Sequence, residues 1–347
     1  MNVIRLFKSF FSSDIAIDLG SENTIIYVKN EGIVLNEPTM VAAKYVYGSK
    51  EYIECGTEAK NLLGKSPKNI EIISPIKNGA IVDLTATEAM IEQFISRING
   101  KSFFRPSPTV LVAIPYSTSG VGRKAVEDAI YNAGAKEVVF VKQGLAGAMG
   151  CHLDISSTTP SCIIDIGAGT TEITVVASSG IIFSKTFEVG GDDITNSIKD
   201  YILEEYAVEI GFENAENLKK RLATVIPEEV DIIEKMIIKG KNTVNNKPVT
   251  IEINQKDIYL GLFEPMSKII DAIDETFREL PAETISNLFQ NGVKLIGGSS
   301  QINGLSEVIS KYVGLKTEVV KNPELSVITG CGIILDESTS FYEHEEF

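Results

Sequence analysis

The alternation of apolar and polar positions predicts two β-hairpins far apart in the chain. Residues 14–28 and 161–176 each contain two runs rich in Ile, Val and Thr around a polar turn with glycine. Such runs separated by a short turn are typical of antiparallel strand pairs. Asp18 recurs as Asp165, 147 residues later, and further positions match at the same offset. The pattern therefore predicts two related halves.

Strand-like and helix-like runs alternate around these hairpins. Val110–Pro115 has the pattern of a strand, Val121–Asn132 that of a helix, and Glu137–Lys142 that of another strand. This alternation is typical of α/β domains, in which helices cover a sheet. We expect two α/β halves with a cleft between them.

Two stretches fall outside that alternation and read as insertions. Residues 33–69 contain short scattered strands and the turn Tyr47-Gly-Ser-Lys50. Residues 186–244 are predicted to be mostly helical, because Ile194–Tyr206 and Ala215–Val225 carry apolar residues at helical spacing. Each half is therefore expected to hold one insertion.

The two ends have distinct patterns. Met1–Ser13 places apolar residues on one helical face with Arg5 and Lys8 off it, which predicts a short amphipathic helix. That helix would pack on a core or lie on a membrane surface, and both alternatives stay open. The acidic tail Phe341–Phe347 is expected to be mobile and solvated.

Composition narrows the class of protein. The 347 residues exceed the ceiling of about 250–300 for one core, so two domains are expected. Lys and Arg total 32 against 47 Asp and Glu, and the net charge of −15 argues against binding to nucleic acid. Four cysteines without CxxC spacing favour a reducing compartment. Without an 18-residue apolar run or a secretory signal, we expect a cytoplasmic protein, soluble or on a membrane surface.

The hairpin turns suit a polyphosphate, because glycine-rich turns present backbone N–H groups to an anion. The first turn offers Gly20, Ser21, Asn23 and Thr24, and the second offers Gly167, Ala168, Gly169, Thr170 and Thr171. Asp18 and Asp165 beside a polyphosphate predict a Mg²⁺ site. Ordinary β-turns are the alternative, but the constant offset disfavours it.

Two further glycine motifs precede predicted helices. In Leu295–Ile302, the residues Gly297, Gly298, Ser299, Ser300 and Gln301 could hold the base or the α-phosphate of a nucleotide. A plain strand–turn–helix connection is the alternative. In Val189–Asp193, Gly191 and Asp192 open a helix, where Asp192 is either a ligand contact or an N-cap.

These motifs together resemble a known superfamily. The hairpins, Ile296-Gly-Gly, Gly190-Gly-Asp192 and stretches such as Gly32–Pro38 and Arg105–Pro108 are similar to actin, Hsp70 and the sugar kinases. Within that superfamily the chain resembles the MreB-type bacterial actins, from about Asp14 to Ile334. The resemblance implies an actin-like α/β fold, with two duplicated ribonuclease H-like halves around a nucleotide cleft and a smaller subdomain inserted in each.

The resemblance also implies boundaries for these parts. The first large subdomain would comprise 1–32, 70–143 and 325–347, with 33–69 inserted. The second would comprise 144–185 and 245–324, with 186–244 inserted.

The function that the resemblance implies is that of a cytoskeletal protein of cell shape. MreB-type proteins bind ATP with Mg²⁺ and polymerise into paired filaments on the inner face of the cell membrane. Glu216 and Lys219 match the family's adenosine contacts, with a surface ion pair as the alternative. The expected partners are further copies of the chain, the inner membrane surface through Met1–Phe11 and a loop with Phe103 and Phe104, and paralogues or membrane shape proteins.

The chain departs from the family at its catalytic position. The family carries a glutamate that positions the attacking water, whereas this chain has Gln143, which with Thr170 is the catalytic candidate. An amide can orient a water molecule but cannot accept its proton, so slow or altered hydrolysis is expected. The neighbouring Lys142 would face either the phosphate or solvent, and Gly122 replaces a family glutamate without a predicted consequence.

Two other functions fit the sequence less well. A small-molecule kinase of the same superfamily needs a carboxylate base for the acceptor hydroxyl, and the sequence offers no candidate. A chaperone-like ATPase needs a separate peptide-binding domain, for which the 347 residues leave no room.

Overall fold

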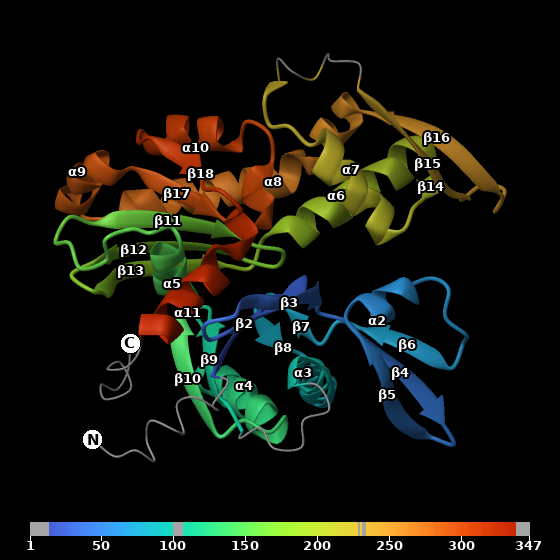
Figure 1. The fold of residues 1–347 in the computed structure, drawn as a ribbon. Helices are drawn as coiled ribbons and strands as arrows, with labels where there is room; N and C mark the ends of the chain where they lie inside the picture. Colours follow the sequence, from blue (N-terminus) through green and yellow to red (C-terminus); the bar gives the residue numbers. More distant parts are fainter. Residues whose placement is uncertain (1–13, 100–106, 228–229, 231–233, 338–347) are drawn as a thin grey trace. The chain divides into compact units, whose positions relative to one another are not determined.

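A computed structural model of the chain describes residues 14–99, 107–227, 230 and 234–337. The chain forms two compact units (Figure 1). Unit 1 comprises Met1–Ser156, Ser179–Ile181 and Leu325–Phe347, and unit 2 comprises Ser157–Ser178 and Ile182–Glu324. The predictions for Met1–Ser13, Phe103, Phe104 and Phe341–Phe347 fall outside the described residues.

Unit 1 is built on a five-stranded sheet in the order β10-β9-β1-β2-β3. Its strands are β1 (Ile15–Leu19), β2 (Asn23–Val28), β3 (Gly32–Pro38), β9 (Thr109–Ile114) and β10 (Glu137–Lys142). β1 pairs antiparallel with β2 and parallel with β9, and its apolar side chains are buried. The predicted hairpin and the predicted strands around residues 110 and 137 are therefore confirmed.

Longer helices accompany this sheet in the described part of unit 1. They are α3 (Leu84–Asn99), α4 (Gly120–Asn132), α5 (Gln143–Gly150) and α11 (Ser326–Glu337). α4 begins after Ser119, whose hydroxyl accepts a hydrogen bond from the N–H of Gly122 at 3.1 Å and so caps the helix. Met90 and Phe94 of α3 and Ile130 of α4 are fully buried in the core with the β1 and β2 side chains.

α5 and α11 cross in very close contact. A β-carbon on Gly330 of α11 would overlap the carbonyl oxygen of Ala146, and one on Gly150 of α5 would overlap that of Ser326. Only glycine permits this approach of two backbones. α5, which begins at Gln143, therefore packs against a segment from the far end of the chain.

The predicted insertion at 33–69 contains a small sheet in the order β5-β4-β6. Its elements are β4 (Val41–Val46), β5 (Ser49–Cys55), α2 (Thr57–Asn61) and β6 (Ile70–Ile73), followed by the hairpin β7 (Ile76–Lys77) and β8 (Ala80–Ile81). Tyr47 and Gly48 form the predicted turn with positive φ angles of 48° and 87°. The sheet continues past residue 69, since β6 pairs with β4.

Unit 2 repeats the plan of unit 1. Its sheet has the order β13-β12-β11-β17-β18. The strands are β11 (Ser161–Ile166), β12 (Thr171–Ala177), β13 (Gly180–Phe187), β17 (Val293–Ile296) and β18 (Thr317–Val319). β11 pairs antiparallel with β12 and parallel with β17, just as β1 pairs with β2 and β9. The duplication predicted from the sequence is therefore present in the fold.

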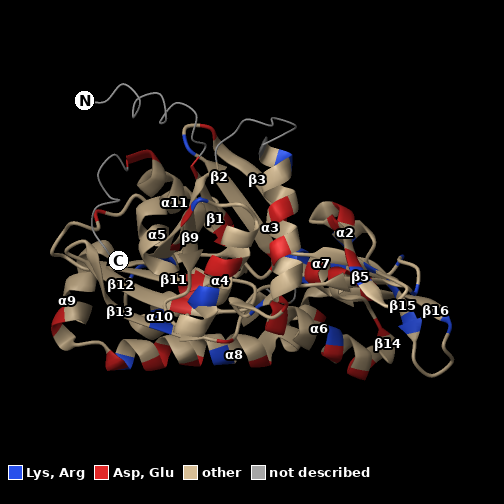
Figure 2. Ribbon diagram, turned by 90° about the horizontal axis from the view of Figure 1, so that it is seen from below, with Lys and Arg blue, Asp and Glu red and all other residues tan. Residues whose placement is uncertain are grey.

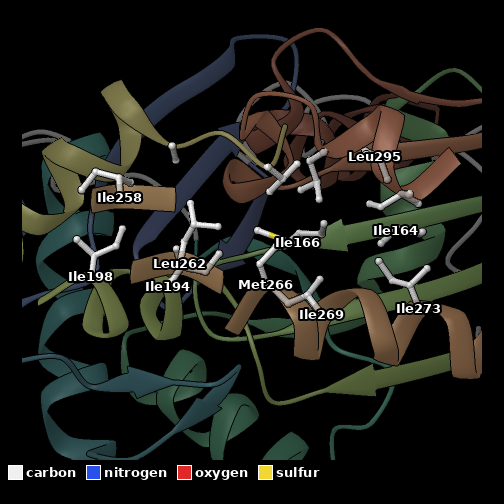
Figure 3. Packing of buried hydrophobic residues seen from close by; sticks show 14 of the residues in the cluster. Ile164, Ile166, Ile194, Ile198, Ile258, Leu262, Met266, Ile269, Ile273 and Leu295 are labelled. Carbon is white, nitrogen blue, oxygen red and sulfur yellow. The ribbon is translucent and has the colours of Figure 1, made fainter. Parts of the chain in front are cut away.

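The remaining elements of unit 2 are mostly helical. They are α6 (Gly191–Tyr206), β14 (Val208–Glu209), α7 (Phe212–Leu222), β15 (Lys235–Asn242), β16 (Pro248–Asn254), α8 (Gln255–Glu279), α9 (Ala282–Asn291), η2 (Gly298–Gln301), α10 (Leu305–Val313) and η3 (Pro323–Leu325). Figure 3 shows Ile194 of α6 and Leu262 and Met266 of α8 packed with Ile166 of β11. The outer face of α8 instead carries charged pairs such as Lys268 with Glu264 (Figure 2).

The second predicted insertion is less helical than expected. The prediction Ile194–Tyr206 lies within α6, but α7 ends at Leu222 rather than Val225 because Ala223 is extended. Residues 235–242 form β15, in which Met236 and Ile238 are covered while Lys235, Ile237 and Lys239 are exposed, the alternation of a strand. β15 pairs with β16, which lies beyond residue 244.

Among the described residues, none of the helices combines the length and the apolar character that a membrane crossing requires.

Candidate functional site

The β1–β2 turn of unit 1 is braced by two threonines. The Thr39 hydroxyl donates to the carbonyl oxygen of Gly20 at 2.7 Å, and the Thr24 and Thr39 hydroxyls lie 2.9 Å apart. Thr24 is fully buried, so its side chain holds the turn. Ser21 accepts a hydrogen bond from the N–H of Gly79 at 3.2 Å, and the Asn23 carbonyl leaves no room for a β-carbon on Gly20.

Asp18 and Gln143 meet inside unit 1. The Gln143 amide, at the start of α5, donates to Oδ1 of Asp18 on β1 across 3.5 Å. Burial raises the pKa of the Asp18 carboxyl to about 6, and this long hydrogen bond offsets only part of that effect. The single long hydrogen bond does not offset the cost of burying a charged carboxylate. A hard divalent cation would stabilise the charged form of Asp18, so the site suits such an ion.

Lys142, next to Gln143, contacts a different group. Its ammonium donates to the carbonyl oxygen of Tyr116 at 3.2 Å and lies 5.5 Å from the centre of the Tyr116 ring. Of the two neighbours it is therefore Gln143 that faces Asp18.

The β11–β12 turn of unit 2 is tied to two other elements through Gly167. The Gly167 N–H donates to the carbonyl oxygen of Thr170 at 2.9 Å, which closes the turn. The Gly167 carbonyl oxygen accepts from the N–H of Gly191 at 2.9 Å and from the Ser299 hydroxyl at 3.1 Å. Thr171 is fully buried and donates to the Val189 carbonyl oxygen at 2.8 Å, so it braces this turn as Thr24 braces the first.

The start of α6 docks onto the same turn. The Asp192 N–H donates to the carbonyl oxygen of Ala168 at 2.7 Å. The N-cap is Gly190, whose N–H is accepted by the Asp193 carboxylate at 2.8 Å. The N-cap alternative for Asp192 is therefore wrong, because Asp192 is the second helical residue and Asp193 supplies the capping carboxylate.

Some amides of the turn remain available. Within the described residues, the N–H groups of Ala168 and Gly169 donate to no other group of the chain. Adjacent free N–H groups of this kind form an anion-binding concavity. The turn is therefore chemically suited to phosphate oxygens, as the sequence predicted.

The glycine motif after β17 lies beside Asp165 at the end of β11. Gly297 has a φ of 81° and lies against Asp165, where a β-carbon would overlap the Asp165 carboxylate. The buried Ser300 hydroxyl donates to the Gly297 carbonyl oxygen at 2.7 Å. A β-carbon on Gly298 would meet open space, while Gln301 is exposed and turns to Glu324 at 3.3 Å. Gly297 thus brings the motif close to Asp165, while the Gln301 amide donates to the Gly298 carbonyl oxygen as well as to Glu324.

Glu216 and Lys219 form an ion pair on α7 at 2.6 Å. Their side chains are only 16% and 8% exposed, so the alternative of a surface ion pair is wrong. Burial by itself would raise the pKa of the Glu216 carboxyl, but the Lys219 charge and hydrogen bonds from Lys219 and Thr195 outweigh it and hold the pKa below its usual value. Both residues reach the α6 start, since Lys219 donates to the Gly191 carbonyl oxygen at 2.9 Å.

The sequence prediction missed two residues that hold these turns. Thr39 follows β3, and no pattern around it indicated a role. Thr195 is fully buried in α6 and contacts Gly191, Glu216 and Lys219. The sequence feature that could have indicated Thr195 is a hydroxyl residue on the apolar side of a helix, between Ile194 and Ile198.

The predicted residues thus gather in two groups. Unit 1 holds Asp18, Gln143 and the Gly20–Thr24 turn, and unit 2 holds Asp165, the Gly167–Thr171 turn, the α6 start, Ser299 and the Glu216–Lys219 pair. No group of three or more His, Cys, Asp or Glu that could form a metal site by itself occurs among the described residues.

Comparisons with known proteins agree with this arrangement. The family model described as MreB/Mbl protein matches residues 12–343. The cell shape-determining protein MreB of Escherichia coli (strain K12) is 35% identical over 337 residues, 96% of each chain. The cell shape-determining protein Mbl of Bacillus subtilis (strain 168) is 34% identical over 94% of this chain and 96% of its own.

Solved structures show the same fold. MreB5 of Spiroplasma citri bound to AMPPNP has a TM-score of 0.85 and 28% identity, over 92% of this chain and 95% of its own. A MamK double helical filament has a TM-score of 0.76 and 18% identity over 93% and 99%, which bears on the fold alone. The actin-like fold is thereby confirmed. With a family model and full-length relatives in agreement, the chain belongs to the MreB/Mbl family.

Proposed function

We propose that this chain is an ATP-binding actin homologue that polymerises into membrane-associated filaments and helps to govern cell shape. The observation that carries the proposal is the repeated hairpin, with its matching aspartates and, in unit 2, a turn with free N–H groups. The relatives named as cell shape-determining proteins support it. So do the Spiroplasma citri structures bound to AMPPNP and to ADP.

Unit 2 supplies most of the contacts to the nucleotide in this proposal. The N–H groups of Ala168 and Gly169 bind phosphate oxygens, and the motif at Gly298 adds backbone groups near them. The Glu216 carboxylate meets the nucleoside. Asp165 beside Gly297 and Asp18 in unit 1 are the carboxylates that would hold Mg²⁺, which when bound neutralises phosphate charge. The prediction that both turns act on one nucleotide stays a prediction.

The hydrolytic step in this proposal depends on Gln143. Its amide orients a water molecule and leaves the water proton without a carboxylate acceptor, so hydrolysis is slow. Thr170, half-buried in the second turn, is the other candidate catalytic residue. General-base catalysis contributes about 10²–10⁴-fold in other enzymes, and an amide at position 143 cannot supply that contribution.

Attachment to the membrane is assigned to Met1–Phe11. Its apolar residues would enter the interface, while the net charge of −15 repels an anionic surface at long range. A single short helix binds weakly, but many copies on one filament multiply that affinity. Membrane binding is therefore coupled to polymerisation.

Sedimentation with simultaneous phosphate release tests the proposal. The chain should pellet with Mg²⁺-ATP and stay in the supernatant with EDTA, and phosphate should appear slowly in the pelleting sample. A chain that neither binds ATP nor pellets under any of these conditions would contradict the proposal.

A further inference from the structure

We propose that Lys219 is a positioning residue that links Glu216 to the phosphate-binding turn. This inference rests on the proposed nucleotide site, and it gives Lys219 a role beyond the adenosine contact that the family resemblance implied.

All the hydrogen-bonding capacity of Lys219 is used within unit 2. An ammonium group has three N–H donors. Its nitrogen lies 2.9 Å from the Gly191 carbonyl oxygen, 2.8 Å from the Thr195 hydroxyl and 2.6 Å from Oε2 of Glu216. The side chain is 8% exposed, so little of it is accessible to a ligand. Each of the three donors of Lys219 therefore has an acceptor within unit 2.

Thr195 completes the arrangement. Its hydroxyl accepts from Lys219 and lies 2.5 Å from Oε2 of Glu216 and 2.9 Å from the Gly191 carbonyl oxygen. A hydroxyl has one proton, so it donates to one of these two acceptors at a time. Oε2 of Glu216 is thus held by both Lys219 and Thr195, while Oε1 pairs with the exposed Lys220 at 3.2 Å.

The other side of the link runs through the Gly191 backbone. The Gly191 carbonyl oxygen accepts from Lys219, and the Gly191 N–H donates to the Gly167 carbonyl oxygen. A β-carbon on Gly191 would overlap the Ser299 hydroxyl, which also donates to Gly167. Two polar contacts therefore separate Lys219 from the turn that offers the Ala168 and Gly169 amides.

The burial of charge explains why the link is rigid. A buried ammonium is costly unless it is paired and fully hydrogen-bonded. Any displacement of Glu216 or of the α6 start would leave Lys219 with an unpaired donor, so both are held in one geometry. The chain thereby couples the position of the nucleoside-side carboxylate to the geometry of the phosphate turn.

Hydrogen exchange on the nucleotide-free protein tests the proposal without depending on ATP binding. Lys219→Met removes the three donors and keeps a similar length. We expect exchange in peptides covering 165–171 and 189–195 to accelerate about tenfold, the scale of one lost charged hydrogen bond. Lys220→Met is the matched control, because Lys220 pairs with Glu216 but contacts neither Gly191 nor Thr195. Equal exchange in the two variants would overturn the proposal.

A second pair of variants remains informative if Lys219→Met does not fold. Thr195→Val removes the hydroxyl and keeps the shape, whereas Thr195→Ser keeps the hydroxyl. Thr195→Val should accelerate exchange in the same two peptides and weaken ATP binding about tenfold, while Thr195→Ser should retain both properties. Equal behaviour of these two variants would also overturn the proposal. A wild-type chain that binds no ATP would instead contradict the proposed function, while the exchange data would still decide the role of Lys219.

Discussion

Asp18 and Asp165 occupy matching positions in two separate sheets. Asp18 on β1 is paired with Ile25 on β2, and Asp165 on β11 is paired with Glu172 on β12, each partner lying seven residues further along the chain. Each aspartate is also aligned with a parallel strand, β9 for Asp18 and β17 for Asp165. The match therefore covers register and topology as well as residue type.

Replacing either aspartate should weaken the binding of Mg²⁺-ATP. We expect Asp165→Ala and Asp18→Asn each to raise the Kd for ATP about tenfold or more with Mg²⁺ present, because each removes a carboxylate that a hard cation prefers. A fluorescence titration with a labelled ATP analogue measures this. With EDTA in place of Mg²⁺, the Kd values of the wild type and the variants for ATP should differ far less. An unchanged Kd in Asp165→Ala would show that the repeated turns do not form a nucleotide site.

A carboxylate at position 143 should accelerate hydrolysis. Gln143→Glu provides a proton acceptor where the parent offers an amide, so phosphate release should rise about tenfold or more under polymerising conditions. Gln143→Ala, which can neither orient water nor accept a proton, is the control and should release phosphate more slowly than the parent. If Gln143→Glu released phosphate no faster than the parent, the role assigned to position 143 would be wrong.

The Glu216 ion pair should make part of the stability depend on pH. The pKa of Glu216 is lower in the folded chain than the ordinary value of 4.5, so on acidification the unfolded state binds the proton first. The stabilisation is therefore complete above pH 4.5 and is lost as the pH falls through the folded value. We expect Glu216→Gln to cost about 1–3 kcal/mol at pH 7 and less near pH 4, as measured by urea unfolding. If the difference in unfolding free energy between the wild type and Glu216→Gln grew on acidification, this prediction would be wrong.

The crossing of α5 and α11 should tolerate no side chain at Gly330. Gly330→Ala places a methyl group against the Ala146 backbone, which cannot rotate away, so we expect a loss of about 1–3 kcal/mol and a lower Tm. Gly120→Ala is a suitable control, because a β-carbon there meets nothing within 4 Å. Two variants of equal Tm would show that the helices can separate without cost.

Deletion of residues 1–11 should abolish liposome binding by filaments. Co-flotation with anionic vesicles under polymerising conditions should require this segment, whereas monomers of either form should float poorly because one short helix is a weak anchor. Pelleting without vesicles controls for free filaments. Equal flotation of the full-length and shortened chains would assign the segment to core packing.

The sequence was informative where local patterns determine local structure. The hairpins at Asp18 and Asp165 and the helix predicted at Val121–Asn132 follow from the pattern of apolar and polar positions, and the structure confirms them. β15 differs from the predicted helical insertion, and the run Met236-Ile-Ile238 hides its strand pattern because the exposed Ile237 is as apolar as its covered neighbours. The roles of Thr195 and Gly191 depend on contacts with α7 and the Gly167 turn, and no single stretch of sequence contains both partners.

The make-up of unit 1 has a consequence for synthesis on the ribosome. α11 packs on α5 and contacts β1, and Asp336 accepts a hydrogen bond from the Tyr27 hydroxyl at 2.6 Å. Residues 157–324, which include the whole of unit 2, are translated before α11 emerges. The unit that begins first is therefore the last to be completed, the reverse of the usual order in which an N-terminal domain folds first. A nascent chain halted before Ser326 would carry a full set of unit 2 elements and a unit 1 without one of its helices.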